Sequence, residues 1–386
     1  MELTLFLYTF SLALFFTFLI FKHSSKNQHH HLPPSPAPAI PVIGHLHLLK
    51  PPLHRTFHRF SQKHGPIFSL KLGTRCVVVV SSLKLVEECF TVNDVIFSNR
   101  PLGLVEKYIG YNQTTMAGAP YGQHWRKLRR LGAQEVFSSA RLNAFSHIRE
   151  DEASNLGDDR RVFEHAQSSN PEDFLPFLNM IDYRGLNKKL AVVGAKLDNF
   201  YQGLLEEHRL EKRNTIIGHL LSLQESDPDL YTDQTIKGFM TSMIIGGTDT
   251  DEVTVEWAMS VLLNHPQLLQ NAKLELDLQV GHQRPQSMGR AHEFKPERFE
   301  GREVEPQTLL TFGMGRKACP GAGLGHRLVG LALGSLIQCF DWERVGLEEI
   351  DLTEGVGLTM PKLKPLEAMC RPREIMLKVL QESVDI

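Results

Sequence analysis

The chain has 386 residues, which is enough to bury a large core in one big domain or two ordinary ones. Its 42 lysines and arginines against 44 aspartates and glutamates give a net charge of −2, which argues against a nucleic-acid-binding protein. The apolar share of 42% excludes a disordered chain, and the five cysteines, none in CxxC spacing, argue against a disulfide framework or a zinc ribbon.

An uncharged apolar run, Leu3–Phe21, stands near the start of the chain. As a helix it would be about 29 Å long, close to the hydrocarbon core of a bilayer at about 30 Å. Glu2 precedes the run and Lys22 and Lys26 follow it, a pattern that favours an uncleaved signal-anchor over a cleaved signal peptide. Residues 1–22 are therefore predicted to be a single-pass membrane anchor, with the rest of the chain on the cytosolic side.

Residues 23–41 form a polar stretch that ends in the proline-rich segment Pro33–Pro41. Proline fixes φ and favours extended polyproline geometry, so the segment is predicted to be a stiff spacer. The same composition is typical of a ligand for a small adaptor domain. Its place directly after the anchor favours the spacer, which would set how the body sits on the membrane.

The body, residues 42–386, is predicted to be mainly helical with a minor β-sheet. Gly73-Thr74 separates an alternating strand from a run of four valines, which indicates a hairpin. Residues 232–264 contain no proline over 33 residues and would form a helix of about 50 Å. Glu206 and Arg209 are interpreted as a surface pair. The predicted helices span residues 53–64, 83–92, 121–137, 187–213, 232–264 and 321–340, and the predicted strands span 67–72 and 76–81.

The strongest chemical signal is the string of ten residues from Phe312 to Gly321, which contains Cys319. Glycines let a chain pass close to a flat cofactor, and a helix beginning just after Cys319 would stabilise a thiolate with its N-terminal dipole. A lone cysteine is more often a small buried apolar residue, but the whole string favours a metal-ligating thiolate. No G-x-G-x-x-G follows a strand here, so a dinucleotide site is disfavoured.

This string is similar to the haem-binding loop of cytochrome P-450 enzymes, in which the cysteine thiolate is the proximal iron ligand. The resemblance implies that Cys319 binds the iron of haem b, that Phe312 packs near the sulfur and that Lys317 meets a haem propionate. The family usually has arginine where Lys317 stands. Lysine keeps the charge but loses the forked geometry.

Other segments resemble the same family. Gly246–Thr250 is similar to its oxygen-activating stretch, which implies that Asp249 relays a proton and that Thr250 hydrogen-bonds the dioxygen being activated. Without the resemblance, this stretch would more often be a solvated turn of helix. Trp125 and Arg129 match its Trp-x-x-x-Arg pattern, whose members bond the haem propionates. The alternative is a basic exposed helix with one buried tryptophan. Pro296–Phe299 is similar to the loop before the haem segment, with Arg298 expected to brace the core.

The wider resemblance is to plant membrane-bound members of the isoflavone-hydroxylase-like subfamily. It rests on the proline spacer, on Phe97–Pro101 and on the tails 358–361 and 365–368. It implies a monooxygenase in the endoplasmic reticulum membrane that inserts one atom of O2 into a small apolar aromatic metabolite of isoflavonoid or flavonoid type. Electrons would come from NADPH through NADPH-cytochrome reductase, with cytochrome b5 as a candidate second partner.

Two stretches that the family carries are predicted to be missing, one near residues 151–162 and one near 281–293. The second would hold a helix with Glu-x-x-Arg, whose ion pair joins Arg298. Residues 281–293 contain Gly281, Pro285 and Gly289, which leaves no room for an average helix of about 11–12 residues. The fold is therefore predicted to be incomplete, so two alternatives stay open: a truncated, inactive relative, or a membrane-anchored haem-binding or interaction protein.

Overall fold

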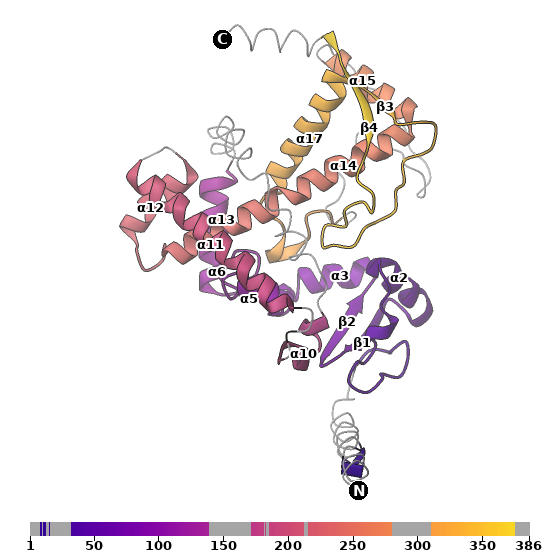
Figure 1. Ribbon diagram of the computed structural model, residues 1–386, viewed down its shortest axis with the longest axis vertical. Helices are drawn as coiled ribbons and strands as arrows, with labels where there is room; N and C mark the ends of the chain where they lie inside the picture. Colours follow the sequence, from indigo (N-terminus) through magenta and orange to yellow (C-terminus); the bar gives the residue numbers. More distant parts are fainter. Residues whose placement is uncertain are drawn as a thin grey trace. The chain divides into compact units, whose positions relative to one another are not determined.

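The structure is a computed structural model that describes residues 8–9, 11–12, 15, 32–138, 171–180, 182, 185–211, 215–279 and 310–374 (Figure 1). It divides into two compact units. The first comprises Met1–Glu88 and Asn170–Leu186, and the second comprises Cys89–Ser169 and Asn187–Ile386. The predicted missing stretches near 151–162 and 281–293, and the Pro296–Phe299 segment with Arg298, lie outside the described residues.

The first unit is built on the hairpin that the sequence predicts. Strands β1 (Ile67–Leu72) and β2 (Arg75–Val80) pair antiparallel, with Leu72 opposite Arg75 across the turn. Gly73 has a φ of 58°, and a Cβ there would overlap the carbonyl oxygen of Phe174. The unit also contains η1 (Leu46–Leu48), α2 (Leu53–His64), most of α3 (Leu83–Phe90), η4 (Pro171–Asp173) and α10 (Pro176–Met180).

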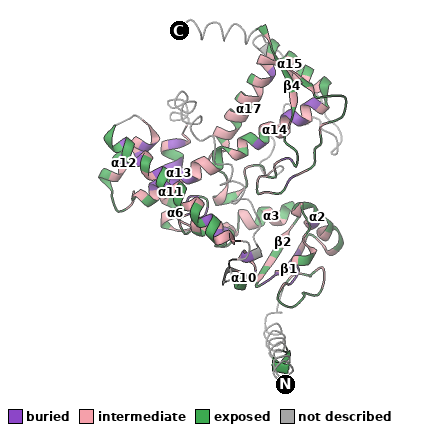
Figure 2. Cartoon of the chain, viewed as in Figure 1, coloured by how far each residue is buried: buried purple, intermediate pink, exposed green. Residues whose placement is uncertain are grey.

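Helix α2 packs on this hairpin through aromatic side chains. The rings of Phe57 and Phe60 lie 6.5 and 5.9 Å from the ring of Phe68, measured between centroids. Phe68, Leu70 and Leu72 form the buried core beneath them. Since the helix buries one side, its other side is left at the surface, as the exposed residues in Figure 2 show.

The second unit is helical, with one small sheet. Its main core lies among α6, α11, α12 and α13 and includes the fully buried Tyr201, Leu205, Leu220 and Phe239. The elements are α4 (Asp94–Phe97), α5 (Leu104–Tyr108), α6 (Gln123–Leu131), η2 (Gly132–Val136), α11 (Leu186–Leu210), α12 (Ile216–Ser226), α13 (Asp233–Gly247), α14 (Asp249–Asn264), α15 (Pro266–Gln279), η7 (Gly315–Lys317), α17 (Ala322–Cys339), β3 (Phe340–Arg344) and β4 (Ala368–Pro372).

The predicted class, mainly α with a minor sheet, is confirmed. The helix over 53–64 and the strand over 67–72 have the predicted bounds. The predicted helix over 121–137 begins at Gln123, and its last five residues before Phe137 form a single π-helical turn. The described sheets are β1–β2 and the antiparallel pair β3–β4.

The single long helix predicted over 232–264 is wrong. The structure has two helices, α13 and α14, separated at Thr248, whose φ of −107° and ψ of −69° leave the regular helical values. Gly246 and Gly247 directly precede this residue, and each is about 1 kcal/mol less favourable in a helix than alanine. Two adjacent glycines therefore weaken the helix at the point where it breaks.

The predicted surface pair of Glu206 and Arg209 is also wrong. Arg209 Nη2 donates to Asp233 Oδ1 at 2.5 Å and to Gln224 Oε1 at 2.9 Å, whereas Glu206 Oε1 accepts from Gln202. This contact joins α11 to the start of α13, and the Arg209 hydrogen bond lowers the pKa of Asp233. Residues distant in sequence therefore compete successfully with the neighbour on the same helix.

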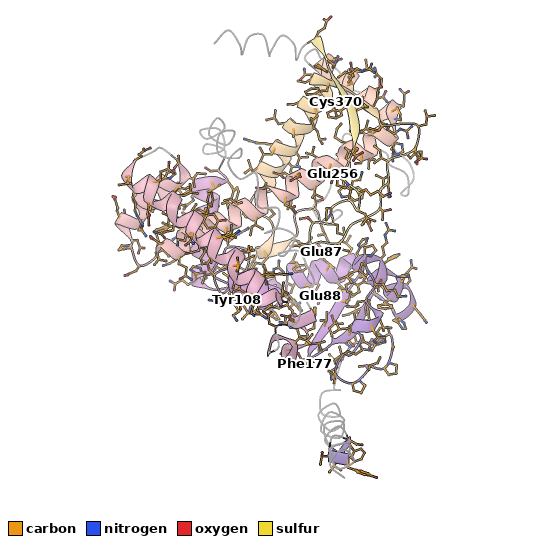
Figure 3. The ribbon with its side chains drawn as sticks, in the orientation of Figure 1. Glu87, Glu88, Tyr108, Phe177, Glu256 and Cys370 are labelled. Atoms are coloured by element: carbon orange, nitrogen blue, oxygen red, sulfur yellow. The ribbon has the colours of Figure 1, made fainter. Side chains whose placement is uncertain are left out.

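The segment between β3 and β4 lies along α14. Four side chains of one helix, α14, hold it, among them Glu256 (labelled in Figure 3). The bonds are Leu366 N to Glu256 Oε1 at 2.8 Å, Trp257 Nε1 to the Met360 carbonyl at 3.0 Å, Lys362 Nζ to Ser260 Oγ at 2.9 Å, and a reciprocal pair between Asn264 and Ile350 at 2.9 and 2.8 Å.

In the part of the chain that the structure describes, no helix combines the length and the apolar composition needed to cross a bilayer. Most of the predicted anchor, residues 1–22, falls outside those residues. The anchor and the spacer over 23–41 therefore stay predictions.

Candidate active site

The loop that carries Cys319 is folded back on itself by backbone contacts. The Cys319 amide donates to the Phe312 carbonyl at 2.7 Å, and the intervening Gly313 and Gly315 have φ values of 70° and 69°, which favour glycine. Helix α17 begins at Ala322, three residues after Cys319, as the sequence predicts. The Cys319 side chain is exposed, so its thiol is accessible to a ligand.

Two contacts fix this loop to α4 and the residues around it. Arg316 Nε lies 2.8 Å from Asp94 Oδ2, and its Nη1 donates to the Tyr121 hydroxyl at 3.2 Å. Gly315 lies against the backbone of Phe90, since a Cβ at Gly315 would overlap the Phe90 carbonyl oxygen. The position of the cysteine is thus set by groups more than 180 residues earlier in the chain.

Trp125 brings two cations together beside the loop. The Lys317 ammonium lies 4.6 Å and the Arg129 guanidinium 5.6 Å from the centre of its ring. Trp125 is buried and its Nε1 donates to the Met116 carbonyl at 3.2 Å, which fixes the ring plane. The structure therefore gathers three predicted cofactor-binding residues, Trp125, Arg129 and Lys317, in one place.

Little negative charge lies near the cations of Lys317 and Arg129 to balance them. Burial, and then the charges of Arg100 and Arg129, lower the pKa of Lys317 to about 8, against the opposing charge of Glu106. Burial also lowers the pKa of Arg129, and a Cys319 thiolate would act in the opposite direction. Burial raises the pKa of Glu106, so this carboxyl is a weak counter-charge. Among the described residues Arg129 pairs with no carboxylate.

This donor set fits haem. An exposed thiol can ligate iron, and half-buried cations with little counter-charge can bind the two carboxylates of the same cofactor. Cys319 would hold the iron, and Lys317, Arg129 and the face of Trp125 would hold the propionate side. A haem bound there supplies an iron at which dioxygen is reduced, so that one oxygen atom can enter a substrate.

The oxygen-activating motif lies at the break between α13 and α14. Thr250 is exposed, and its hydroxyl donates to the Gly246 carbonyl at 2.6 Å. Asp249 is half-buried at the first position of α14. The proton relay by Asp249 and the hydrogen bond of Thr250 to dioxygen are not tested by this geometry and stay predictions. Asp251, which departs from the family pattern, is nearer, because its Oδ1 and the Phe312 ring both lie against Gly325 of α17.

Phe312 was expected to pack near the Cys319 sulfur, but the contact described for its ring is with His326 of α17. Its ring contacts His326 edge-on at 4.7 Å between centroids, and its carbonyl, not its ring, has the described bond to Cys319. Burial raises the pKa of the neighbouring Asp251. The ring thus seats the loop on α17, and its contact with the sulfur stays a prediction.

Sequence reasoning missed several residues of this site. Phe137 faces the loop, since a Cβ on Gly321 would lie 3.3 Å from its ring and 3.9 Å from Cys319 Sγ. Asp94 and Glu106, the acidic neighbours of Arg316 and Lys317, were not singled out either. Phe137 follows Trp125 and Arg129 in the predicted helix, a usable signal, but nothing in the sequence pairs Asp94 with Arg316.

Gly315→Ala is expected to lower the free energy of unfolding by about 2–4 kcal/mol, because alanine is strained in a left-handed conformation and its Cβ would displace Phe90. Gly323→Ala is the matched control. It lies in α17 with open space around its Cα, so it should be neutral or stabilise the helix by up to about 1 kcal/mol. Urea unfolding in detergent, followed by circular dichroism, measures both; equal effects would contradict the role of Gly315.

The comparisons with known proteins agree with this site. The family model described as "Cytochrome P450" matches residues 33–183, 158–291 and 282–366. The chain belongs to the cytochrome P-450 family. Membership makes it a monooxygenase by class, with haem iron held by a thiolate.

Curated plant P-450 proteins match over nearly the whole chain. Cytochrome P-450 81Q32 of Catharanthus roseus is 42% identical over 498 residues, covering 99% of this chain and 100% of the relative. The (+)-piperitol/(+)-sesamin synthase of Sesamum radiatum is 42% identical, covering 97% of each. The isoflavone 2′-hydroxylase of Glycyrrhiza echinata is 38% identical, covering 97% of this chain and 98% of the relative.

The fold of this chain is also similar to that of a solved zebra fish structure. That cytochrome P-450, with abiraterone, has a TM-score of 0.65 and 21% identity, and covers 84% of this chain and 100% of its own. The resemblance to the isoflavone-hydroxylase-like plant members is confirmed by the curated relatives.

Proposed function

We propose that this P-450 chain is built to hydroxylate a small, flat aromatic plant metabolite of isoflavonoid or flavonoid type. The observation that carries the proposal is the exposed thiol of Cys319 beside two half-buried cations, Arg129 and Lys317, for which Glu106 is only a weak counter-charge. Electrons come from NADPH through NADPH-cytochrome reductase, with cytochrome b5 as a second donor. The cofactor is haem b.

The residues divide this work among them. The Cys319 thiolate is the metal ligand, while Lys317, Arg129 and Trp125 hold the carboxylate edge of the cofactor. Asp249 relays a proton from solvent toward the dioxygen being reduced. Thr250 hydrogen-bonds that dioxygen through its hydroxyl, which first has to leave the Gly246 carbonyl. The break at Thr248 supports this step, since a weakened helical turn admits a water molecule.

The substrate class rests on the relatives. Their names, a (+)-piperitol/(+)-sesamin synthase and an isoflavone 2′-hydroxylase, describe enzymes of aromatic plant metabolites. In this chain the substrate contacts come from residues 102–118, from α13 before Gly246, and from residues 358–360. Leu358 is 82% exposed, so an apolar side chain is available at the last of these.

The second candidate is an inactive relative that lacks part of the scaffold. The alignment with the Catharanthus protein is 498 residues long, against 386 residues in this chain, so the relative carries positions without counterparts here. The family model matches in three separate segments, which overlap over residues 158–183 and 282–291 of this chain. The interruptions of the match at these two places support a loss of family residues near the predicted stretches 151–162 and 281–293.

The test of the proposed reaction uses ¹⁸O2. The full chain, and a version with both stretches restored from a relative, are reconstituted with plant reductase, NADPH and a panel of flavonoids and isoflavonoids. A product heavier by one ¹⁸O atom and dependent on NADPH supports hydroxylation. Its absence from the restored version, with haem bound, would overturn the proposed substrate class.

The location follows from the anchor, which we place at residues 1–22 with the catalytic body in the cytosol. A fluorescent protein fused to the C-terminus is expected to mark the endoplasmic reticulum and to be digested by protease added to intact microsomes. Lys22 and Lys26 behind the apolar run are the reason for this orientation. Protection of the fused protein from the protease would refute it.

A further inference from the structure

The α5–α6 loop, residues 109–122, lies against both α11 and α13. At the end of α5, a Cβ on Gly194 of α11 would lie 2.5 Å from the Tyr108 carbonyl oxygen, so the two backbones approach closely. Further along, the Met116 amide donates to Ser242 Oγ of α13 at 3.1 Å. Two helices distant from the loop in sequence therefore determine where it lies.

Three successive residues of this loop adopt the left-handed conformation, although none of them is glycine. Tyr111, Asn112 and Gln113 have φ values of 49°, 54° and 62°. This conformation is unfavourable for residues with a Cβ, and the cost is repeated at each of the three. The loop therefore needs stabilising side-chain contacts to keep its shape.

One carboxylate oxygen supplies such a contact and joins the loop to α13. Asp198 Oδ1 of α11 accepts a hydrogen bond from the Tyr111 hydroxyl at 3.0 Å and another from Lys237 Nζ at 2.9 Å. The Lys237 side chain is only 9% exposed, so the carboxylate offsets the water that its ammonium has lost. Burial, and then the Asp198 charge, raise the pKa of Tyr111, so its hydroxyl stays a donor. We call Tyr111, Asp198 and Lys237 the Asp198 clamp.

A second tyrosine makes a comparable contact with α11. Tyr108 (labelled in Figure 3) donates to Asn187 Oδ1 at 3.1 Å, near the beginning of that helix. Its acceptor is neutral, whereas a hydrogen bond to a carboxylate is about twice as strong. The two tyrosines thus give a matched pair of contacts between the loop region and α11, of which the one through Asp198 continues to α13.

We propose that Asp198 is a positioning residue for substrate binding, which holds the α5–α6 loop in a fixed place on α13. The proposal rests on the proposed function, in which residues 102–118 and α13 before Gly246 contact the substrate. Both segments bond to the same Asp198 oxygen, so this residue acts through them and not by touching the substrate. A substrate that needs both segments binds more weakly as the fraction of molecules with both in place falls.

An ion pair that serves stability alone is the other interpretation of this contact. In that case the loss of Asp198 would destabilise α11 and α13 together with the loop. A clamp, in contrast, releases the loop while both helices stay folded. Local opening and global unfolding differ in the set of backbone amides that exchange with solvent, so hydrogen exchange separates the two interpretations.

The first test measures amide hydrogen exchange and needs no bound haem. The full chain is studied in detergent, and mass spectrometry follows peptides from the loop, α11 and α13. The Thr114 and Met116 amides, which donate to Gly110 and Ser242, report on the loop. We expect Asp198→Ala to speed their exchange about tenfold or more, the factor that a hydrogen bond to a charged group supplies. Exchange within α11 and α13 should change little.

Three further variants separate the clamp from a general loss of contacts. Tyr111→Phe keeps the ion pair and should speed loop exchange as Asp198→Ala does, so it serves if Asp198→Ala misfolds. Asp198→Asn keeps an acceptor oxygen and should have a smaller effect than Asp198→Ala. Asn187→Ala, the matched control, removes the acceptor of Tyr108 and should leave exchange at Thr114 and Met116 unchanged.

The second test links the clamp to the substrate. In the version with both stretches restored, reconstituted with reductase and NADPH, Asp198→Ala should raise the KM for the flavonoid or isoflavonoid several-fold. The kcat should change less than about twofold, because fewer molecules are ready to bind while the chemical step is unchanged. Asn187→Ala should leave both constants unchanged, and haem content is measured in every variant.

Equal loop exchange in Asp198→Ala, Tyr111→Phe and the unaltered chain would overturn the clamp, as would a loop already unprotected in the unaltered chain. Faster exchange throughout α11 and α13 would assign the ion pair to stability alone. Faster loop exchange with an unchanged KM would overturn the role in substrate binding. If the restored, haem-bound protein hydroxylates no flavonoid or isoflavonoid, the proposed substrate class fails and this role fails with it, while the exchange results still decide whether the clamp exists.

Discussion

Restoring the two missing stretches is expected to give the chain a thiolate-type carbon monoxide band that the 386-residue form shows weakly or not at all. Arg298 is predicted to lose its ion-pair partners, and breaking a buried pair typically costs about 3–5 kcal/mol. The free energy of unfolding of a domain is only about 5–15 kcal/mol. The losses are thus comparable with the whole stability.

Helix α17 shows the same deficit in the described part of the chain. It is largely apolar over Ala322–Cys339, yet its buried residues comprise only Ile337, and Leu331 is 68% exposed. Each large apolar side chain left in water forfeits about 1.5–3 kcal/mol. A helix that follows the cysteine loop this closely cannot hold the loop firmly without partners for those side chains.

The experiment compares four proteins: the chain as it is, each stretch restored alone, and both restored. Solubility in detergent, haem content and the reduced carbon monoxide difference spectrum are measured for each, with and without residues 1–21. Only the doubly restored protein is expected to be monodisperse and to bind haem stoichiometrically. A monodisperse 386-residue product with one haem per chain and hydroxylase activity would overturn this expectation.

Cys319→Ser is expected to abolish the thiolate-type band of the doubly restored protein, because an alcohol does not ionise near neutral pH and cannot replace the thiolate. The matched control is Cys370→Ser, an exposed cysteine on β4 (labelled in Figure 3), which should leave the band unchanged. Haem content is measured alongside, so that lost ligation is separated from lost cofactor. A mutant that keeps the band would exclude Cys319 as the ligand.

Local patterns predicted the local structure of this chain well. The helix over 53–64 and the hairpin around Gly73 depend on neighbouring residues, and both have their predicted place. The ten-residue string also predicted that a helix follows Cys319. In each case the controlling interactions lie within a few residues of one another.

Long-range contacts were not predictable in the same way. The ion pair of Asp94 and Arg316, and the carboxyl of Glu106 near Lys317, join parts of the chain about 200 residues apart. The break at Thr248 was missed because the single helix was predicted from the absence of proline over 232–264, while the two preceding glycines weaken the backbone there. The sequence therefore predicted the chemistry of the site, but not the long-range contacts that position its residues.

The four contacts between α14 and the segment before β4 also determine the order in which this part can fold. Each joins residues separated by 86 to 110 positions. Synthesis at about 5–20 residues per second leaves α14 without these partners for roughly 5–20 s. During that time its contact surface is open to chaperones and to other nascent chains. The helix that carries Asp249 and Thr250 is thus completed only when nearly the whole polypeptide has been translated.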